Sequence, residues 1–138
     1  MMMRKAPSRG RGQRGQSAIE TALMMVLIIT VIFSIFEICE LMYTYSVIAD
    51  AANEGVRYAI VHSGGDVSGT RNQVLKFAKL SMHDVSAMTT TVSFPDGAAT
   101  PPSRVRVTVS YSYIPYIHSF MRNPPSMNAY SEGRMVVQ

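Results

Sequence analysis

The stretch that decides the fold of this chain is GQSAIETALMMVLIITVIFSIFEICELMYTYSVIADAANEGVRY, which runs from Gly15 to Tyr58. Its first part, from Thr21 to Phe36, holds sixteen residues without a charge. A helical pattern of apolar residues continues beyond this run, and no Pro interrupts the stretch. These features predict one long helix over residues 16–62, with an apolar first half and an amphipathic second half.

The apolar half of this helix has the length of a membrane span. Sixteen helical residues rise about 24 Å, and a bilayer core about 30 Å thick asks for about 20 residues. Apolar neighbours on both sides lengthen the run. The sequence therefore predicts a single transmembrane segment at about residues 18–42.

The net charge of +4 is concentrated at the N-terminus. Five of the thirteen basic residues fall within residues 1–15, where there is no acid, while the rest of the chain has eight basic and nine acidic residues. A short Gly/Arg-rich leader could bind a nucleic-acid backbone, but this one lacks aromatic residues and directly precedes an apolar helix. Positive charge there retains the N-terminus in the cytoplasm. We therefore interpret residues 1–15 as a cytoplasmic leader and expect no nucleic-acid partner.

Three interpretations of the apolar segment compete. The first is an ordinary single-pass anchor. The second is a secretory signal peptide, for which the tripeptide Ala49-Asp50-Ala51 has a suitable cleavage pattern but lies too far beyond the apolar run. The third takes together Gly15, which ends the basic leader, and Glu20, which opens the apolar helix. That spacing is typical of the processing site of type IV pilin-like precursors.

The wider stretch resembles the TadE-like family of Tad/Flp pilus assembly proteins. The resemblance rests on Arg14-Gly15-Gln16 with Glu20, then on the segment from Glu37 to Tyr45, and then on the block AANEGVRYA at residues 51–59. It covers about the first sixty residues. The chain departs from the family pattern by having Thr21, Val26 and Glu40 where other residue types are frequent.

The resemblance implies a pseudopilin or minor pilin that is cut by prepilin peptidase between Gly15 and Gln16. It implies a single-pass protein of the bacterial inner membrane with an extracytoplasmic C-terminus. The implied partners are the peptidase, other pilins or pseudopilins, the inner-membrane assembly platform and the membrane itself.

Glu20 has a chemical reason to lie near the start of the helix. A carboxylate inside a membrane is costly and is usually paired or functional. Cleavage after Gly15 would give Gln16 a free α-amine, with which Glu20 of the same or a neighbouring subunit could pair to register an incoming subunit. The alternative is that Glu20 merely marks the membrane interface. Glu37 and Glu40, three residues apart and on one face, are expected to emerge at the outer boundary.

The remainder, residues 63–138, predicts a small extracytoplasmic domain of one helix and three strands. In the long helix, a core stripe is expected at Leu41, Tyr45, Ile48, Ala52, Val56 and Ala59. Its opposite face carries Glu54 and Arg57, which can pair at i, i+3. Thr70 is the expected N-cap of a second helix, with Gln73 as its capping-box partner.

The last third has the pattern of an antiparallel sheet. Strands are expected over residues 85–94, 104–113 and 127–137, with a turn at Pro95-Asp96-Gly97. The middle strand alternates, with odd positions facing the core and Tyr113 near an edge. The predicted fold class is α+β, with the long helix packed on a small sheet as in pilin-like proteins, because so short a domain needs the helix as one wall of its core.

The sequence shows no enzyme chemistry. The three His residues have no metal-ligand spacing, and there is no phosphate-binding Gly-rich loop or nucleophile motif. We therefore expect no catalytic activity, no metal and no cofactor. The lone Cys39 cannot form an intrachain disulfide. Two functions remain: a processed pilus assembly protein, or an uncleaved single-pass membrane protein whose extracytoplasmic domain binds a partner.

Overall fold

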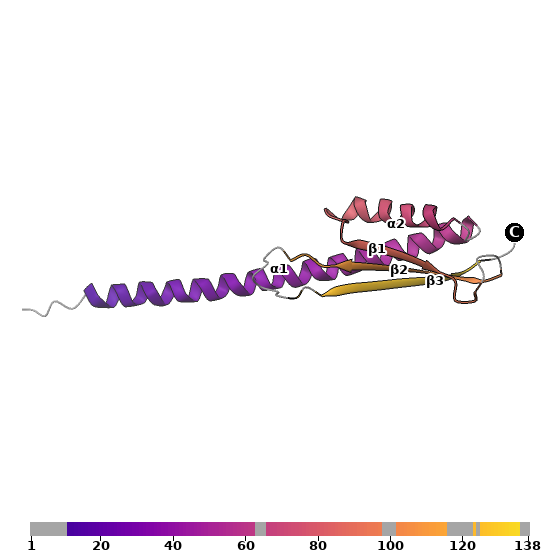
Figure 1. Cartoon of the computed structure of the whole chain (residues 1–138). Coiled ribbons are helices and arrows are strands. Elements are labelled where there is room, and N and C mark those ends of the chain that lie inside the picture. Colours follow the sequence, from indigo (N-terminus) through magenta and orange to yellow (C-terminus); the bar gives the residue numbers. More distant parts are fainter. Residues whose placement is uncertain (1–10, 63–65, 98–101, 116–122, 124, 136–138) are drawn as a thin grey trace, which may run out of the picture. The chain divides into compact units, whose positions relative to one another are not determined.

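The computed structural model describes residues 11–62, 66–97, 102–115, 123 and 125–135 (Figure 1). These residues form helices α1 (Arg11–Val61) and α2 (Val67–Ser81) and strands β1 (Met88–Ser93), β2 (Arg104–Ser112) and β3 (Ser126–Arg134). The predicted α+β class is confirmed. The contacts divide the chain into an N-terminal unit, residues 1–38, and a C-terminal unit, residues 39–138.

The three strands form one antiparallel sheet in the order β1-β2-β3. Val107 lies opposite Val92 of β1, and Val109 lies opposite Ala129 of β3, so the central strand pairs on both edges. The predicted turn between β1 and β2 is present: the backbone N–H of Gly97 donates to the Phe94 carbonyl at 3.0 Å. Gly97 has a φ of 76°, a conformation that favours glycine over other residues.

The alternation predicted for the central strand is confirmed. Val105, Val107 and Val109 are completely buried, while Arg104 before them and Arg106 between the first two are exposed. Each buried Val contributes roughly 1.5–3 kcal/mol relative to an exposed one. Tyr113, also an odd position, follows the last residue of β2 and is buried, with 3% of its surface exposed.

The C-terminal part of α1 forms one wall of the core of the C-terminal unit. Four residues of the predicted stripe, Ile48, Ala52, Val56 and Ala59, are buried in the same cluster as the sheet valines. Tyr45 was predicted wrongly, since 51% of its surface is exposed. The buried face of α1 is wider than the predicted stripe and has a different centre, because the core cluster joins α1 to both α2 and the sheet. It also includes Thr44, Val47, Ala51 and Gly55.

Two glycines allow close approach of the elements around α1. A β-carbon on Gly55 of α1 would lie 2.5 Å from Cγ2 of Val74 in α2 and 3.2 Å from Cγ1 of Val107 in β2. A β-carbon on Gly133 of β3 would lie 2.5 Å from Cδ1 of Ile60. Any larger residue at these positions would therefore push the helices or the sheet apart.

The start of α2 differs from the prediction. Asp66 is the N-cap, and its Oδ1 accepts a hydrogen bond of 2.8 Å from the backbone N–H of Gly69. Thr70 is a buried residue inside the helix, where its hydroxyl donates to the Asp66 carbonyl at 2.9 Å. The proposed capping box of Thr70 and Gln73 is therefore wrong. Within α2, Val74 and Ala78 are buried, whereas Ser81 at its end is exposed.

Charged residues lie on the solvent-exposed face of the sheet. Arg104 pairs with Asp96 at 2.9 Å, and Arg106 pairs with Glu132 of β3. The Arg106 guanidinium also lies 5.3 Å from the centre of the Tyr130 ring. In α1, Glu54 accepts a hydrogen bond of 3.3 Å from Gln73, and among the described residues it forms no ion pair with Arg57, contrary to the prediction.

Two predicted features lie outside the described residues. The first is residues 63–65, where the sequence Ser-Gly-Gly predicts the end of the long helix. The second is the segment with Ile117 and Phe120, for which the sequence predicts a loop. The last predicted strand ends earlier than expected, at Arg134.

Candidate functional site

The predicted processing residues lie near the start of α1. Gly15 and Gln16 are exposed and helical, and a β-carbon on Gly15 would meet nothing within 4 Å. Packing among the described residues therefore does not require a glycine here. A requirement for Gly15 would have to come from another molecule that recognises it.

Glu20 lies one helical turn beyond Gln16. Its side chain is exposed, like those of its neighbours. Residues four apart share one face of a helix, about 6 Å apart along its axis. This spacing places the carboxylate on the same side of α1 as the backbone nitrogen that cleavage after Gly15 would convert into an amine.

Beyond Glu20, α1 presents an apolar surface on all sides. Every side chain from Ile19 to Phe33 is exposed in the chain, including large ones such as Leu23, which is 72% exposed. This helix is long and apolar enough to cross a membrane, and its most apolar part is almost entirely exposed. A helix that is apolar all round and covered by no part of its own chain is typical of a membrane span. The predicted membrane segment is supported to this extent.

The hydroxyl groups in this segment are satisfied within the helix. Thr30 donates to the Val26 carbonyl and Ser34 to the Thr30 carbonyl, both at 2.8 Å. An unpaired polar group in hydrocarbon would cost several kcal/mol. These local bonds therefore let hydroxyl residues occupy an apolar segment.

The two acids that follow the apolar run have different surroundings. Glu37 is buried, with 5% of its surface exposed, while the neighbouring Cys39 is exposed. Glu40 is half-buried and belongs to the C-terminal unit. The sequence pattern identified their common face and gave no sign of this burial.

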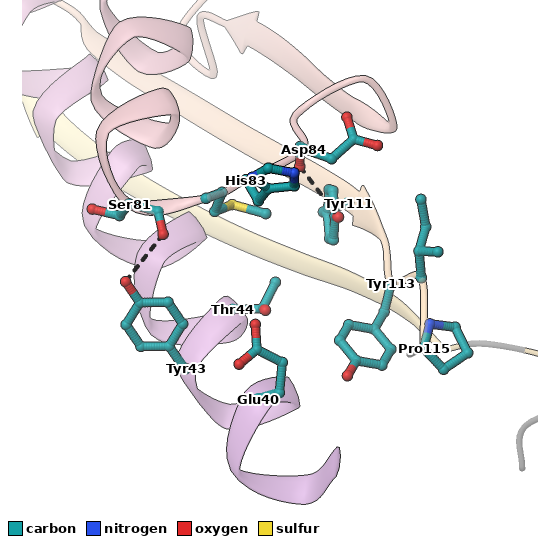
Figure 2. Close-up of a pocket in the computed structure, with 11 residues that line it drawn as sticks. Glu40, Tyr43, Thr44, Ser81, His83, Asp84, Tyr111, Tyr113 and Pro115 are labelled. Atoms are coloured by element: carbon teal, nitrogen blue, oxygen red, sulfur yellow. Dashed lines mark hydrogen bonds between the residues drawn. The ribbon is translucent and has the colours of Figure 1, made fainter. Parts of the chain in front are cut away.

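A cavity of about 290 Å³ lies in the C-terminal unit, beside Glu40 (Figure 2). Three segments line it. They are Glu40, Tyr43 and Thr44 of α1, residues 81–84 at the end of α2 and after it, and Tyr111, Tyr113, Ile114 and Pro115 at the end of β2 and after it. The sequence analysis missed this cavity. Its lining residues are far apart in the chain and follow no motif, so only the tertiary structure brings them together.

A second polar cluster joins the end of α1 to the start of α2. The Tyr58 hydroxyl donates to Oδ2 of Asp66 at 3.3 Å, and the Tyr58 ring stacks on His62 with 3.9 Å between ring centres. The backbone N–H of Gly69 and the hydroxyl of Ser68 both donate hydrogen bonds to the Asp66 carboxylate. These bonds lower the pKa of Asp66. Partial burial, followed by the charge of Asp66, raises the pKa of Tyr58. Since Asp66 already caps α2, we assign this cluster a structural role.

The described part of the chain holds no group of three or more His, Cys, Asp or Glu residues that could bind a metal ion. His62 and His83 are exposed, and His118 lies outside the described residues.

The geometry thus defines a chain with a candidate membrane helix at its N-terminus that continues into a small α+β unit. Comparison with protein families matches residues 15–57 to the family described as TadE-like protein. The match confirms the resemblance for this segment, which runs from the predicted processing site to Arg57. The comparisons with curated proteins and with solved structures gave no match. The matched segment covers residues 15–57 of the 138 residues of the chain.

Proposed function

We propose that this protein is a TadE-like pseudopilin or minor pilin in the assembly of a Tad/Flp-type pilus, and that prepilin peptidase matures it by cleavage after Gly15. The observation that carries the proposal is the arrangement at the start of α1. An exposed Gly15 with no packing role is followed by Glu20 and an uncovered apolar helix, within a segment that matches the TadE-like family.

In this proposal the basic leader stays in the cytoplasm, and residues 18–42 span the inner membrane. Positive charge beside an apolar helix favours this orientation. The sheet and α2 would then lie outside the cytoplasm, where they could meet other pilins or pseudopilins. After cleavage, the α-amine of Gln16 would lie one turn from Glu20. The pair would partly neutralise the carboxylate within its own subunit or in a neighbouring one, which lowers the cost of placing it in the membrane.

Processing is tested by the intact mass and the N-terminal residue of the protein purified from membranes of its host. We expect a chain that begins at Gln16. Gly15→Leu should leave the leader attached, while Gly12→Leu, a matched change in the leader, should still be cleaved. A wild-type chain that retains its leader, or normal cleavage of Gly15→Leu, would contradict the proposed processing.

The role of Glu20 is tested separately from cleavage. We expect Glu20→Gln to give a chain of normal mature mass and abundance but a marked loss of surface pili, counted by electron microscopy. Glu54→Gln, which changes an acid of the same helix in the C-terminal unit, should retain pili. Normal piliation of Glu20→Gln would remove the registration role and leave Glu20 as a marker of the interface.

The second candidate function is an uncleaved single-pass protein whose external domain binds a partner. The cavity beside Glu40 favours it, because a binding domain needs a recognition site. An uncleaved wild-type chain would make this the preferred function.

A further inference from the structure

The cavity in the C-terminal unit has walls held by specific hydrogen bonds. The Tyr43 hydroxyl donates to the Ser81 carbonyl at 3.1 Å, which joins α1 to the end of α2. The Tyr111 hydroxyl donates to the Asp84 carbonyl at 3.3 Å, which joins β2 to the segment after α2. Figure 2 shows both bonds at the border of the cavity. Both bonds fix the segment 81–84 between the other two walls, so the cavity is formed before any ligand arrives.

The described lining of the cavity includes two acidic residues. Glu40, His83 and Asp84 are among its lining residues, and no Lys or Arg of the described part of the chain lines it. The backbone N–H and the side chain of Ser86 both hydrogen-bond to the Asp84 carboxylate. These bonds lower the pKa of Asp84 and keep it ionised. The Asp84 carboxylate is therefore engaged by Ser86, whereas that of Glu40 makes no hydrogen bond or ion pair with any described residue. Glu40 is therefore the carboxylate left to attract a cation and repel an anion.

Glu40 is placed to contact a ligand. In Figure 2 its carboxylate and the Thr44 side chain lie on the wall that α1 forms, and the Tyr113 ring lies on the opposite wall. Glu40 is half-buried, so part of its hydration is already lost. A charge-assisted hydrogen bond from a ligand would replace that hydration.

The other lining groups suit a planar cation. Tyr43, Tyr111 and Tyr113 surround the cavity, and a guanidinium over a Tyr ring gains about 0.5–2 kcal/mol. The guanidinium of Arg can also donate two parallel hydrogen bonds to one carboxylate, which an ammonium cannot. A volume of about 290 Å³ lies at the lower limit of small-molecule sites, about 300–1,000 Å³. It therefore suits one long side chain better than a larger ligand.

From these observations we propose that the cavity binds an arginine side chain of a partner protein, with Glu40 as the carboxylate that receives it and the tyrosines as its apolar walls. This inference goes beyond the proposed function and does not depend on it, because every residue involved lies in the C-terminal unit and none takes part in cleavage after Gly15.

The test uses the full chain in an uncharged detergent, with ¹³C-labelled methionine methyl groups. Met82 lines the cavity, and the buried Met127, which does not line it, serves as an internal control. The probe is N-acetyl-arginine methylamide, and its neutral control is the citrulline counterpart. The arginine and citrulline titrations are done in the same buffer and at the same pH.

We expect the Met82 methyl signal to shift in a saturable way with the arginine probe at millimolar concentration, while the Met127 signal stays in place. Citrulline should give no saturable shift. Glu40→Gln should weaken the arginine response about tenfold or more, and Glu54→Gln should leave it unchanged. An absent response, an equal response to citrulline, or an unaltered affinity in Glu40→Gln would overturn the proposal. None of these results bears on whether the leader is cleaved.

Discussion

Gly55 of α1 lies directly against Val74 of α2, so that a β-carbon on the glycine would lie 2.5 Å from Cγ2 of the valine. Gly55 belongs to the block AANEGVRYA of the TadE-like segment. In this chain the glycine has a packing reason, since it lets α1 approach α2 and β2 at once.

Gly55→Ala is expected to destabilise the C-terminal unit. Alanine favours a helix over glycine by about 1 kcal/mol, but inserting a methyl group into a filled core costs typically 1–3 kcal/mol. The clash is with a buried Val74, so we expect the packing cost to exceed the propensity gain. Thermal unfolding of the full chain in detergent, followed by circular dichroism, measures the difference. Gly55→Ala combined with Val74→Ala should lose less stability than the sum of the single changes, and strict additivity would count against a direct clash.

Gly97 is expected to be sensitive for a backbone reason. It has a φ of 76°, and a β-carbon there would meet nothing within 4 Å. Gly97→Ala should therefore cost about 1–2 kcal/mol through backbone strain alone. Gly97→Asn should cost less, because Asn tolerates the left-handed region. Equal unfolding temperatures for the two variants would show that the turn changes its conformation to accept a side chain.

The N-cap of α2 is expected to add a pH-dependent contribution to stability. The folded-state pKa of Asp66 is lowered by its hydrogen bonds, so its stabilising effect is complete above the unfolded pKa of about 3.9. The effect is lost as the pH falls through the folded value. Asp84 and Asp96 also have lowered pKa values and will add to the acid loss in the wild type. The informative quantity is therefore the difference in unfolding temperature between wild type and Asp66→Ala.

The difference in unfolding temperature between wild type and Asp66→Ala should be large at neutral pH and become smaller in acid. A cap replaced by Ala costs about 0.5–2 kcal/mol. Asp66→Asn retains an acceptor at the cap, so it should keep much of the stability and depend less on pH than the wild type. A difference between wild type and Asp66→Ala that stays constant as the pH falls would show that ionisation of Asp66 does not contribute.

Membrane topology can be tested with a single engineered cysteine. Cys39 is the one cysteine of the chain, and Leu80 of α2 is 81% exposed. In a Cys39→Ser background, Leu80→Cys should react with a membrane-impermeant maleimide added outside the inner membrane, after the outer membrane has been permeabilised. Labelling only after the inner membrane is also disrupted would place α2 in the cytoplasm and contradict the proposed orientation.

Much of the fold could be predicted because its signals are local. The alternation of residues 104–113 depends only on the two-residue period of a strand, and the apolar run depends only on composition. Predictions failed where two local signals were equivalent. Thr70 and Asp66 are both good N-caps, and the helix begins at Val67 because Asp66 is also held by Tyr58 from α1. No residue within α2 indicates that Tyr58 contacts Asp66.

By itself, the sequence determined the long helix, its apolar half and the strand alternation, because each depends on residues that are near one another in the chain. Processing at Gly15 remains a prediction from the sequence. The tertiary structure alone decided which side of α1 is buried, which is why Tyr45 is exposed and Thr44 is not. It also decided that Glu40 borders a cavity with Tyr111 and Tyr113. A helix carries a continuous series of possible faces, and only the elements that pack against it select one of them.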